Sequence, residues 1–243
     1  MTTALFAPVS NAISDTASTP AGFTSDTVTV VIGGSSGIGR AVAQALAQRP
    51  GRVIVAGLST GLDVTDAAAV RAYFDALGPV DHVVVTAGSQ APGGAVTAVD
   101  LDAAKAAFDV KFWGAIAVAR AAAPHLRPGG TLTLTSGFLA RRTVPGAFVK
   151  TAMNAALEVS AKLLARELAP LRVNVVSPGL TDTDAYAGMA PEARAAMLAK
   201  AAATLPAGRV GRPSDLAAGY LFAIDNAFMT GAVIDLDGGA LIQ

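Results

Sequence analysis

Short runs of apolar and β-branched residues alternate with longer Ala- and Leu-rich stretches from about residue 27 to the end of the chain. Buried strands typically span four to eight residues, whereas helices are longer and repeat every 3.6 residues. The pattern predicts strands at 27–32, 53–56, 82–86, 131–135, 172–176 and 232–236. It predicts helices at 38–48, 67–77, 101–126, 151–168 and 213–224.

Strands that alternate with helices are joined by right-handed crossovers, which make the strands parallel and place helices on both faces of the sheet. The sequence therefore predicts an α/β fold, a Rossmann-type doubly wound, mostly parallel sheet of about seven strands. Only 57–62 separate the second strand from Asp63, so the crossover there is either a loop or relies on the next helix at 67–77. We expect one domain at 27–243, preceded by an N-terminal arm at 1–26 that is rich in Ser, Thr, Ala and Pro.

Composition excludes several classes of function. Apolar residues make up 52% of the chain and charged residues 15%, which argues against disorder. A formal net charge of zero and the absence of basic runs argue against nucleic-acid or membrane partners, and no apolar stretch is long enough to span a membrane. There are no cysteines, and His82 and His125 are far apart in the sequence with no cluster of other metal-ligating residues around them, so we expect no metal site. The first residues lack the charges of a targeting signal, and a cytoplasmic location is expected.

The strongest chemical signal is a glycine-rich turn, Gly33-Gly34-Ser35-Ser36-Gly37-Ile38-Gly39, between the first predicted strand and the first predicted helix. Glycines there permit a tight turn and bring backbone N–H groups close to a pyrophosphate at the helix N-terminus. We therefore expect this turn to bind a dinucleotide. Its expected contacts are Gly33, Ser35, Ser36, Gly37, Ile38 and Gly39.

The spacing of these glycines resembles the fingerprint of the short-chain dehydrogenase/reductase family, and the resemblance continues through nearly all of 27–243. Three further segments resemble motifs of the family. Asp63-Val64 resembles its adenine turn, and Pro178-Gly179 with Thr183 resembles the segment that binds the carboxamide. Ala87-Gly88 resembles the second half of its Asn-Asn-Ala-Gly motif, with Val85 and Thr86 in place of the asparagines. The segments 209–215 and 237–239 match the family's C-terminal pattern.

The resemblance implies a nicotinamide dinucleotide held by these residues and a small-molecule substrate. It also implies a homodimer or homotetramer formed through the helices at 101–126 and 151–168. The variable segment at 186–204, which is Ala- and Met-rich, is expected to form a helical cover over the substrate.

Selection between NAD and NADP depends on the end of the second strand, where an acid would bind the ribose diol of NAD. This chain has Gly57-Leu58-Ser59-Thr60 there, with neither an acid nor an arginine. Arg40, directly after the glycine-rich turn, is the candidate cation for a 2′-phosphate, with Leu58 and Ser59 beside the ribose. We favour NADP(H) over NAD(H); the alternative is that Arg40 is a solvated helix residue.

The family's catalytic residues are replaced. The family uses a Tyr as acid/base, a Lys four residues later, a Ser about 13 residues earlier and an Asn on the preceding helix. The flanking Pro145-Gly146 and the segment at 167–170 align the Tyr with Lys150 and the Lys with Asn154. The same register aligns the Ser with Gly137, beside Ser136, and the Asn with Lys111.

Two hypotheses follow from these replacements. A lysine that is desolvated or close to a second cation loses basicity, so Lys150 or Lys111 could donate a proton to the substrate. In this hypothesis the hydroxyl of Ser136 donates a hydrogen bond to the substrate carbonyl, and Asn154 faces the same site. The chain would then be an NADP(H)-dependent oxidoreductase acting on a small carbonyl or alcohol. Alternatively, the lysines contact solvent or a substrate anion, and the chain is an inactive NAD(P)-binding sensor or regulatory partner. Arg141 and Arg142 are either anion contacts or a solvated pair.

Overall fold

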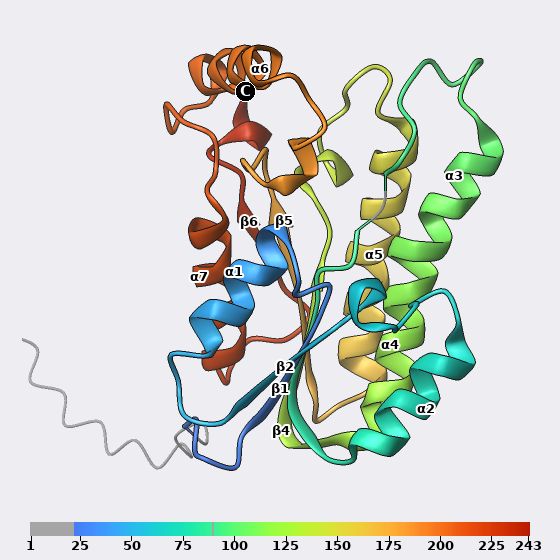
Figure 1. Cartoon of the computed structure of the whole chain (residues 1–243), viewed down its shortest axis with the longest axis vertical. Helices are drawn as coiled ribbons and strands as arrows, with labels where there is room; N and C mark the ends of the chain where they lie inside the picture. The colour runs from blue at the N-terminus through green and yellow to red at the C-terminus, as the bar shows by residue number, and fades with distance from the viewer. Residues whose placement is uncertain (1–21, 89) are drawn as a thin grey trace, which may run out of the picture.

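The computed structural model describes residues 22–88 and 90–243 as one twisted sheet with helices on both faces (Figure 1). Most of the expected N-terminal arm, residues 1–21, lies outside the described residues. The strands are all parallel and run in the order β2-β1-β3-β4-β5-β6. Their bounds are β1 Val28–Ile32, β2 Arg52–Ala56, β3 Val80–Val85, β4 Leu126–Thr135, β5 Arg172–Pro178 and β6 Val233–Leu236.

The helices form one layer on each side of this sheet. Their bounds are α1 Gly37–Leu46, α2 Ala67–Leu77, α3 Leu101–Phe108, α4 Gly114–Ala122, α5 Phe148–Glu167, α6 Pro191–Thr204 and α7 Pro213–Asp225. Helices α1 and α7 cover one face, where Leu46 and Tyr220 are fully buried against Val31 of β1. Helices α2, α4 and α5 cover the other face, where Phe74 and Leu157 pack in the same core as Val30. The doubly wound α/β fold expected from the sequence is confirmed.

The sheet has six strands in the described residues, not about seven. Only a 3₁₀ turn, η1 (Leu58–Thr60), lies between β2 and the start of α2, apart from short loops. A further strand beyond β2 would need its own crossover, and the segment is too short to hold one. Strand β2 is therefore the edge of the sheet.

The helix expected at 101–126 is also shorter and interrupted. A π-turn, η2 (Asp109–Trp113), separates α3 from α4, and α4 ends at Ala122. Pro124 follows within a 3₁₀ turn, because proline lacks the N–H that a continuing helix needs. Strand β4 then begins at Leu126, earlier than the expected 131. Interruptions of the π type are frequent at functional sites, and this one carries Lys111.

The two histidines have structural environments. Burial lowers the pKa of His82 to about 4, and its Nδ1 lies 3.0 Å from the hydroxyl of Thr131. His125 lies 3.1 Å from the carboxylate of Asp75 on α2. Among residues 22–88 and 90–243, no three His, Cys, Asp or Glu side chains are placed to hold a metal, and no helix there is long and apolar enough to cross a membrane.

Candidate functional site

A large cavity of about 1410 Å³ opens at the carboxyl ends of β1, β2 and β3. Strands β2 and β3 lie on opposite sides of β1, so the chain leaves β1 where the strand order reverses, which is where open α/β sheets bind ligands. Most residues predicted at the cofactor line this cavity: Gly33, Ser35, Ser36, Gly37, Ile38, Gly39, Leu58, Ser59, Asp63, Val64, Ala87, Gly88 and Thr183. Arg40, Pro178 and Gly179 are not among the lining residues.

The glycine-rich turn requires glycine at specific positions. Gly33 has a φ of 83°, and a Cβ there would lie 2.7 Å from the backbone nitrogen of Ala87. A Cβ on Gly39 would lie only 2.2 Å from the carbonyl oxygen of Gly33. The hydroxyl of Thr86, which donates to the carbonyl of Ile32 at 2.9 Å, fills the space beside Gly39. Thr86 therefore packs against the glycine-rich turn at the end of β3, a role that the sequence did not predict.

The N-terminus of α1 already holds an anionic group. Ser36, the N-cap residue just before α1, makes no side-chain capping bond, and the first turn of the helix carries no acid. Instead the N–H of Gly37 donates to the carboxylate of Asp184 at 3.2 Å, and Arg40 pairs with the same carboxylate at 2.8 Å. The same groups, a backbone N–H at a helix N-terminus and a guanidinium, can equally well bind the phosphates of a dinucleotide. The residues present therefore fit the pyrophosphate group that the sequence implied.

The adenosine end of the cavity carries no acid at the end of β2. Leu58 is exposed and Ser59 lies beside it in η1. Asp63 accepts hydrogen bonds from the N–H and the hydroxyl of Thr65, at 2.9 and 2.8 Å, which lower the pKa of its carboxyl. Asp63 is thus fixed as an ionised turn residue on the cavity wall.

Lys111 is held at the carboxyl end of β4. Its Nζ donates to the carbonyl oxygen of Ser136 at 2.9 Å. Desolvation of the ammonium, and then the positive charge of Lys150, lower the pKa of Lys111 to about 8. Lys111 therefore gives up its proton more readily than an ordinary lysine.

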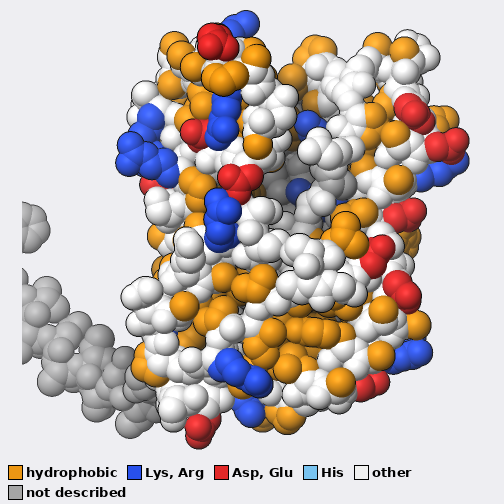
Figure 2. Space-filling model, in the orientation of Figure 1, with side chains coloured by type: hydrophobic (Ala, Val, Ile, Leu, Met, Phe, Trp, Pro, Cys, Tyr) orange, Lys and Arg blue, Asp and Glu red, His pale blue; other side chains and the backbone are white. Residues whose placement is uncertain are grey.

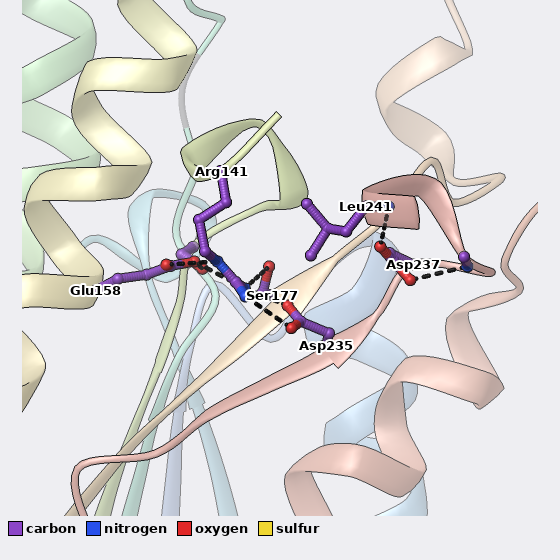
Figure 3. Close-up of polar contacts among 8 residues, drawn as sticks. Arg141, Glu158, Ser177, Asp235, Asp237 and Leu241 are labelled. Carbon is purple, nitrogen blue, oxygen red and sulfur yellow. Dashed lines mark hydrogen bonds and ion pairs between the residues drawn. The ribbon is translucent and has the colours of Figure 1, made fainter. Parts of the chain in front are cut away.

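The hydroxyl of Ser136 is bonded inside a polar cluster. It donates to Oε1 of the buried Glu158 on α5 at 2.9 Å. Arg141 pairs with the same carboxylate at 3.0 Å and also reaches Asp235 of β6 and the hydroxyl of Ser177 of β5, as Figure 3 shows. Ser136 thus connects to Lys111 through its carbonyl and to Glu158 through its hydroxyl.

Arg141 and Arg142, expected to be either anion contacts or a solvated pair, both have partners within the protein. Arg141 is bound within the polar cluster, and Arg142 donates to the carbonyl oxygen of Ala240 and the side chain of Gln243, both at 2.7 Å. Both arginines therefore tie the loop after β4 to the C-terminal segment.

Asn154 lies beside Gly137. Its side chain is 5% exposed, and its Oδ1 has no hydrogen-bond partner among the residues the structure describes. A Cβ on Gly137 would lie 2.9 Å from Nδ2 of Asn154. The fold thus brings together Lys111, Ser136, Gly137 and Asn154, with Lys150 exposed one helical turn before Asn154.

The four residues predicted to be catalytic do not themselves line the cavity. The lining on their side is made by the π-turn residues Asp109 and Val110, together with Ala107, Gly88 and Gln90. The surface in Figure 2 is hollowed between the part that carries α6 and the part that carries α3, and basic side-chain atoms are visible inside the hollow. The roles of Lys111, Ser136, Lys150 and Asn154 stay predictions.

Sequence reasoning missed three residues that the structure places in or next to the site: Asp184, Thr86 and Glu158. Asp184 directly follows Thr183 in the sequence, but nothing in its neighbours marks a contact with Gly37, 147 positions away. Glu158 lies four residues after Asn154, so the helical period is the one signal that would have placed it on the same side of α5.

Comparisons with known proteins cover most of the chain. A family model described as Enoyl-(Acyl carrier protein) reductase matches residues 57–240. The chain is 32% identical over 249 residues to "Short-chain dehydrogenase/reductase ATR9" of Stachybotrys chlorohalonatus, covering 88% of this chain and 96% of the relative. It is 30% identical over 235 residues to "Carbonyl reductase family member 4" of Danio rerio, covering 86% and 96%. A solved structure, described as a small-chain dehydrogenase in complex with NADPH, is 52% identical with a TM-score of 0.88, covering 90% of this chain and 100% of that one.

Proposed function

Because the chain belongs to the short-chain dehydrogenase/reductase family, we propose that it is an NADP(H)-dependent oxidoreductase acting on a small carbonyl or alcohol through a non-standard catalytic site. The observation that carries the proposal is the anion-binding geometry of the glycine-rich turn, where the N–H of Gly37 and the guanidinium of Arg40 both bind the carboxylate of Asp184. NADP(H) is favoured because no acid stands at the end of β2 and Arg40 lies beside the turn. The 52% identical dehydrogenase holds NADPH, which supports the same choice.

NADPH supplies a hydride when bound, and the protein must supply a proton to the substrate oxygen during reduction. We assign the proton to Nζ of Lys111, whose pKa of about 8 lies close to neutral pH, as an effective general acid requires. Lys111 would give this proton to the carbonyl oxygen of the substrate and would be left neutral. Solvent returns the proton afterwards.

The neighbours of Lys111 then act as positioning residues. The carbonyl of Ser136 fixes the ammonium at the end of β4, and Glu158 fixes Ser136 through its hydroxyl. Lys150 contributes its positive charge, which favours loss of the Lys111 proton. The unpartnered Oδ1 of Asn154 offers a buried acceptor in the same cluster.

A second candidate function is nucleotide binding without turnover. It is favoured because the Ser136 hydroxyl, predicted to donate to a substrate carbonyl, already donates its hydrogen bond to Glu158. In that case the chain would sense the NADP(H) level or regulate a partner.

Two measurements separate these functions. Nucleotide fluorescence titrated with protein tests binding of NADPH and NADH, and the absence of a saturable response to either would contradict both functions. A panel of carbonyl compounds with NADPH then tests turnover in the wild type, Lys111→Ala and Lys150→Ala. Lys105→Ala is the matched control, because Lys105 is an exposed lysine on α3 paired with Asp102.

For the oxidoreductase we expect kcat to fall about 10²- to 10⁴-fold in Lys111→Ala, the range of a lost general acid, with intact NADPH binding and an unaffected control. Undiminished turnover in Lys111→Ala would remove the proton assignment. Intact NADPH binding without turnover of any compound by the wild type would favour the second function.

A further inference from the structure

One contact at the glycine-rich turn is not explained by the proposed function. The carboxylate of Asp184 occupies the N–H of Gly37 and the guanidinium of Arg40 at the same time, at 3.2 and 2.8 Å. The proposed function, on which this inference rests, assigns both groups to the phosphates of the cofactor. We propose that Asp184 is an internal competitor of the cofactor, a specificity-determining residue that sets how strongly and how selectively the chain binds phosphate-bearing nucleotides.

The carboxylate of Asp184 is held at this position by its own segment. Asp184 begins a 3₁₀ turn, η5 (Asp184–Tyr186), and the hydroxyl of Thr183 accepts from the N–H of Ala185 at 3.3 Å. Arg194 of α6 anchors the same segment, because it donates to Asp182 and to the carbonyl of Thr183, in each case at 3.1 Å. The turn is therefore placed beside α1 by contacts that do not involve the Asp184 side chain.

Asp184 also lies within the cavity. It lines the cavity together with Thr183, Ala185 and the glycine-rich turn. A Cβ on Gly37 would lie 3.5 Å from Cβ of Thr183, so this segment packs directly over the turn. A phosphate at the N-terminus of α1 would approach the Asp184 carboxylate, and two negative charges at such short range repel each other. Cofactor binding therefore requires Asp184 to leave.

The contact is weak enough to be displaced. The side chains of Asp184 and Arg40 are each 50% exposed, and ion pairs of that exposure contribute little because water competes for both charges. A phosphate carries more negative charge than a carboxylate and accepts from several backbone N–H groups at a helix N-terminus. The cofactor would thus displace the carboxylate but lose part of its binding free energy in doing so.

Competition at Arg40 makes the effect selective. While Asp184 holds Arg40, the guanidinium is not available to a 2′-phosphate, the group that distinguishes NADPH from NADH. Removing the carboxylate charge would relieve repulsion on the pyrophosphate of both nucleotides and also free Arg40 for NADPH. NADPH affinity should therefore rise by more than NADH affinity.

The test is the dissociation constant of each nucleotide for the wild type, Asp184→Asn and Asp184→Ser, measured by nucleotide fluorescence at low and high ionic strength. Asp225→Asn is the matched control, since Asp225 pairs with Arg49 and is 46% exposed but lies on α7, away from the cavity. We expect NADPH to bind about tenfold more tightly to both Asp184 variants than to the wild type. The affinity for NADH should rise by a smaller factor. Both gains in affinity should shrink at high ionic strength, because salt screens the charges. The control should match the wild type.

The outcomes separate this inference from the function on which it rests. NADPH binding to the wild type together with unchanged or weaker binding to both Asp184 variants would overturn the inference alone, as would an equal gain for the two nucleotides. In Asp184→Asn combined with Arg40→Met, the selective part of the gain should disappear, and its persistence would also overturn the inference. No binding of either nucleotide to any variant would contradict the proposed function itself.

Discussion

The ammonium of Lys111 donates to the backbone carbonyl of Ser136 at 2.9 Å. A carbonyl oxygen accepts the hydrogen bond without supplying a negative charge, and Lys111 makes no ion pair with any residue in the described part of the chain. The ammonium is thus desolvated without a counter-ion, which is why its pKa falls to about 8. The same bond fixes the lysine at the end of β4, whereas its acidity comes from desolvation and from the nearby charge of Lys150.

The pH dependence of catalysis should follow this group. Carbonyl reduction needs Lys111 protonated, so kcat for reduction should fall as pH rises through about 8, whereas alcohol oxidation should rise over the same range. The check is a pH profile in both directions, with Lys105→Ala as the reference lysine variant. A wild-type profile that stays flat from about pH 7 to 9 would contradict the assignment.

Stability should also depend on Lys111. Its pKa is 10.5 when exposed and about 8 when folded, so between these values the unfolded chain binds more protons and stability rises with pH. Below about pH 8 the full penalty of burying the charge applies. Lys111→Met should therefore be more stable than the wild type by about 1–2 kcal/mol at pH 7, after the lost hydrogen bond is counted.

Urea denaturation at about pH 7 and 9.5 checks this expectation, because the advantage of Lys111→Met should shrink at the higher pH. An advantage that does not change with pH would mean that the variant gains stability through packing instead of charge.

Introducing serine at Gly137 should disturb the site. A Cβ there would lie 2.9 Å from Nδ2 of the buried Asn154. Gly137→Ser should lower stability by about 1–3 kcal/mol, the usual range for overpacking, and Asn154→Ala in the same chain should relieve part of the loss. Thermal unfolding of the single and double variants measures this coupling. Gly93→Ala, whose Cβ meets nothing closer than 3.6 Å, should be close to neutral.

The buried carboxylate of Glu158 should be essential for stability. Glu158→Gln weakens the bond from Ser136 and removes the negative partner of Arg141 on the α5 side, leaving Asp235 as its acidic partner. Breaking one member of a buried charge cluster costs about 2–4 kcal/mol. Urea denaturation should show this loss, while Glu167→Gln, at the exposed end of the same helix, should change little. A loss as small as that of Glu167→Gln would show that the cluster is energetically unimportant.

Helices α4 and α5 should join two copies of the chain. Val159 and Leu163, one turn apart on α5, are 70% and 56% exposed, and Trp113, just before α4, is 58% exposed. Large apolar side chains exposed together mark association surfaces. We propose a homodimer or homotetramer, and light scattering should show at least twice the chain mass of 24.2 kDa.

Replacing Val159 and Leu163 together by glutamate should reduce the mass measured by light scattering. Val96→Glu changes an exposed valine in a loop before α3 and should leave the mass unchanged. A wild type that is uniformly monomeric would rule out the proposed assembly.

The sequence predicted the order of strands and helices because the signals involved are local: β-branched runs, helical periods and the glycine-rich turn. It overestimated the number of strands and the length of the helix at 101–126. The π-turn at Asp109–Trp113 leaves no mark in the apolar pattern that predicted one helix at 101–126. The most instructive omissions are contacts between distant segments. Asp184 reaches Gly37 only in the folded chain, and Glu158 gains its role from Arg141 and Ser136.

Helix α6 stands apart from the rest of the fold. It has no buried residue, and Figure 1 places it at one end of the molecule, beyond the sheet and the helices that cover it. Folding free energy therefore resides almost entirely elsewhere, and α6 can be exchanged or redesigned with little loss of stability. Since Arg194 ties α6 to the segment that carries Asp184, we expect such exchanges to alter nucleotide affinity. For protein engineering, this helix is a module that can be replaced while the rest of the scaffold is kept.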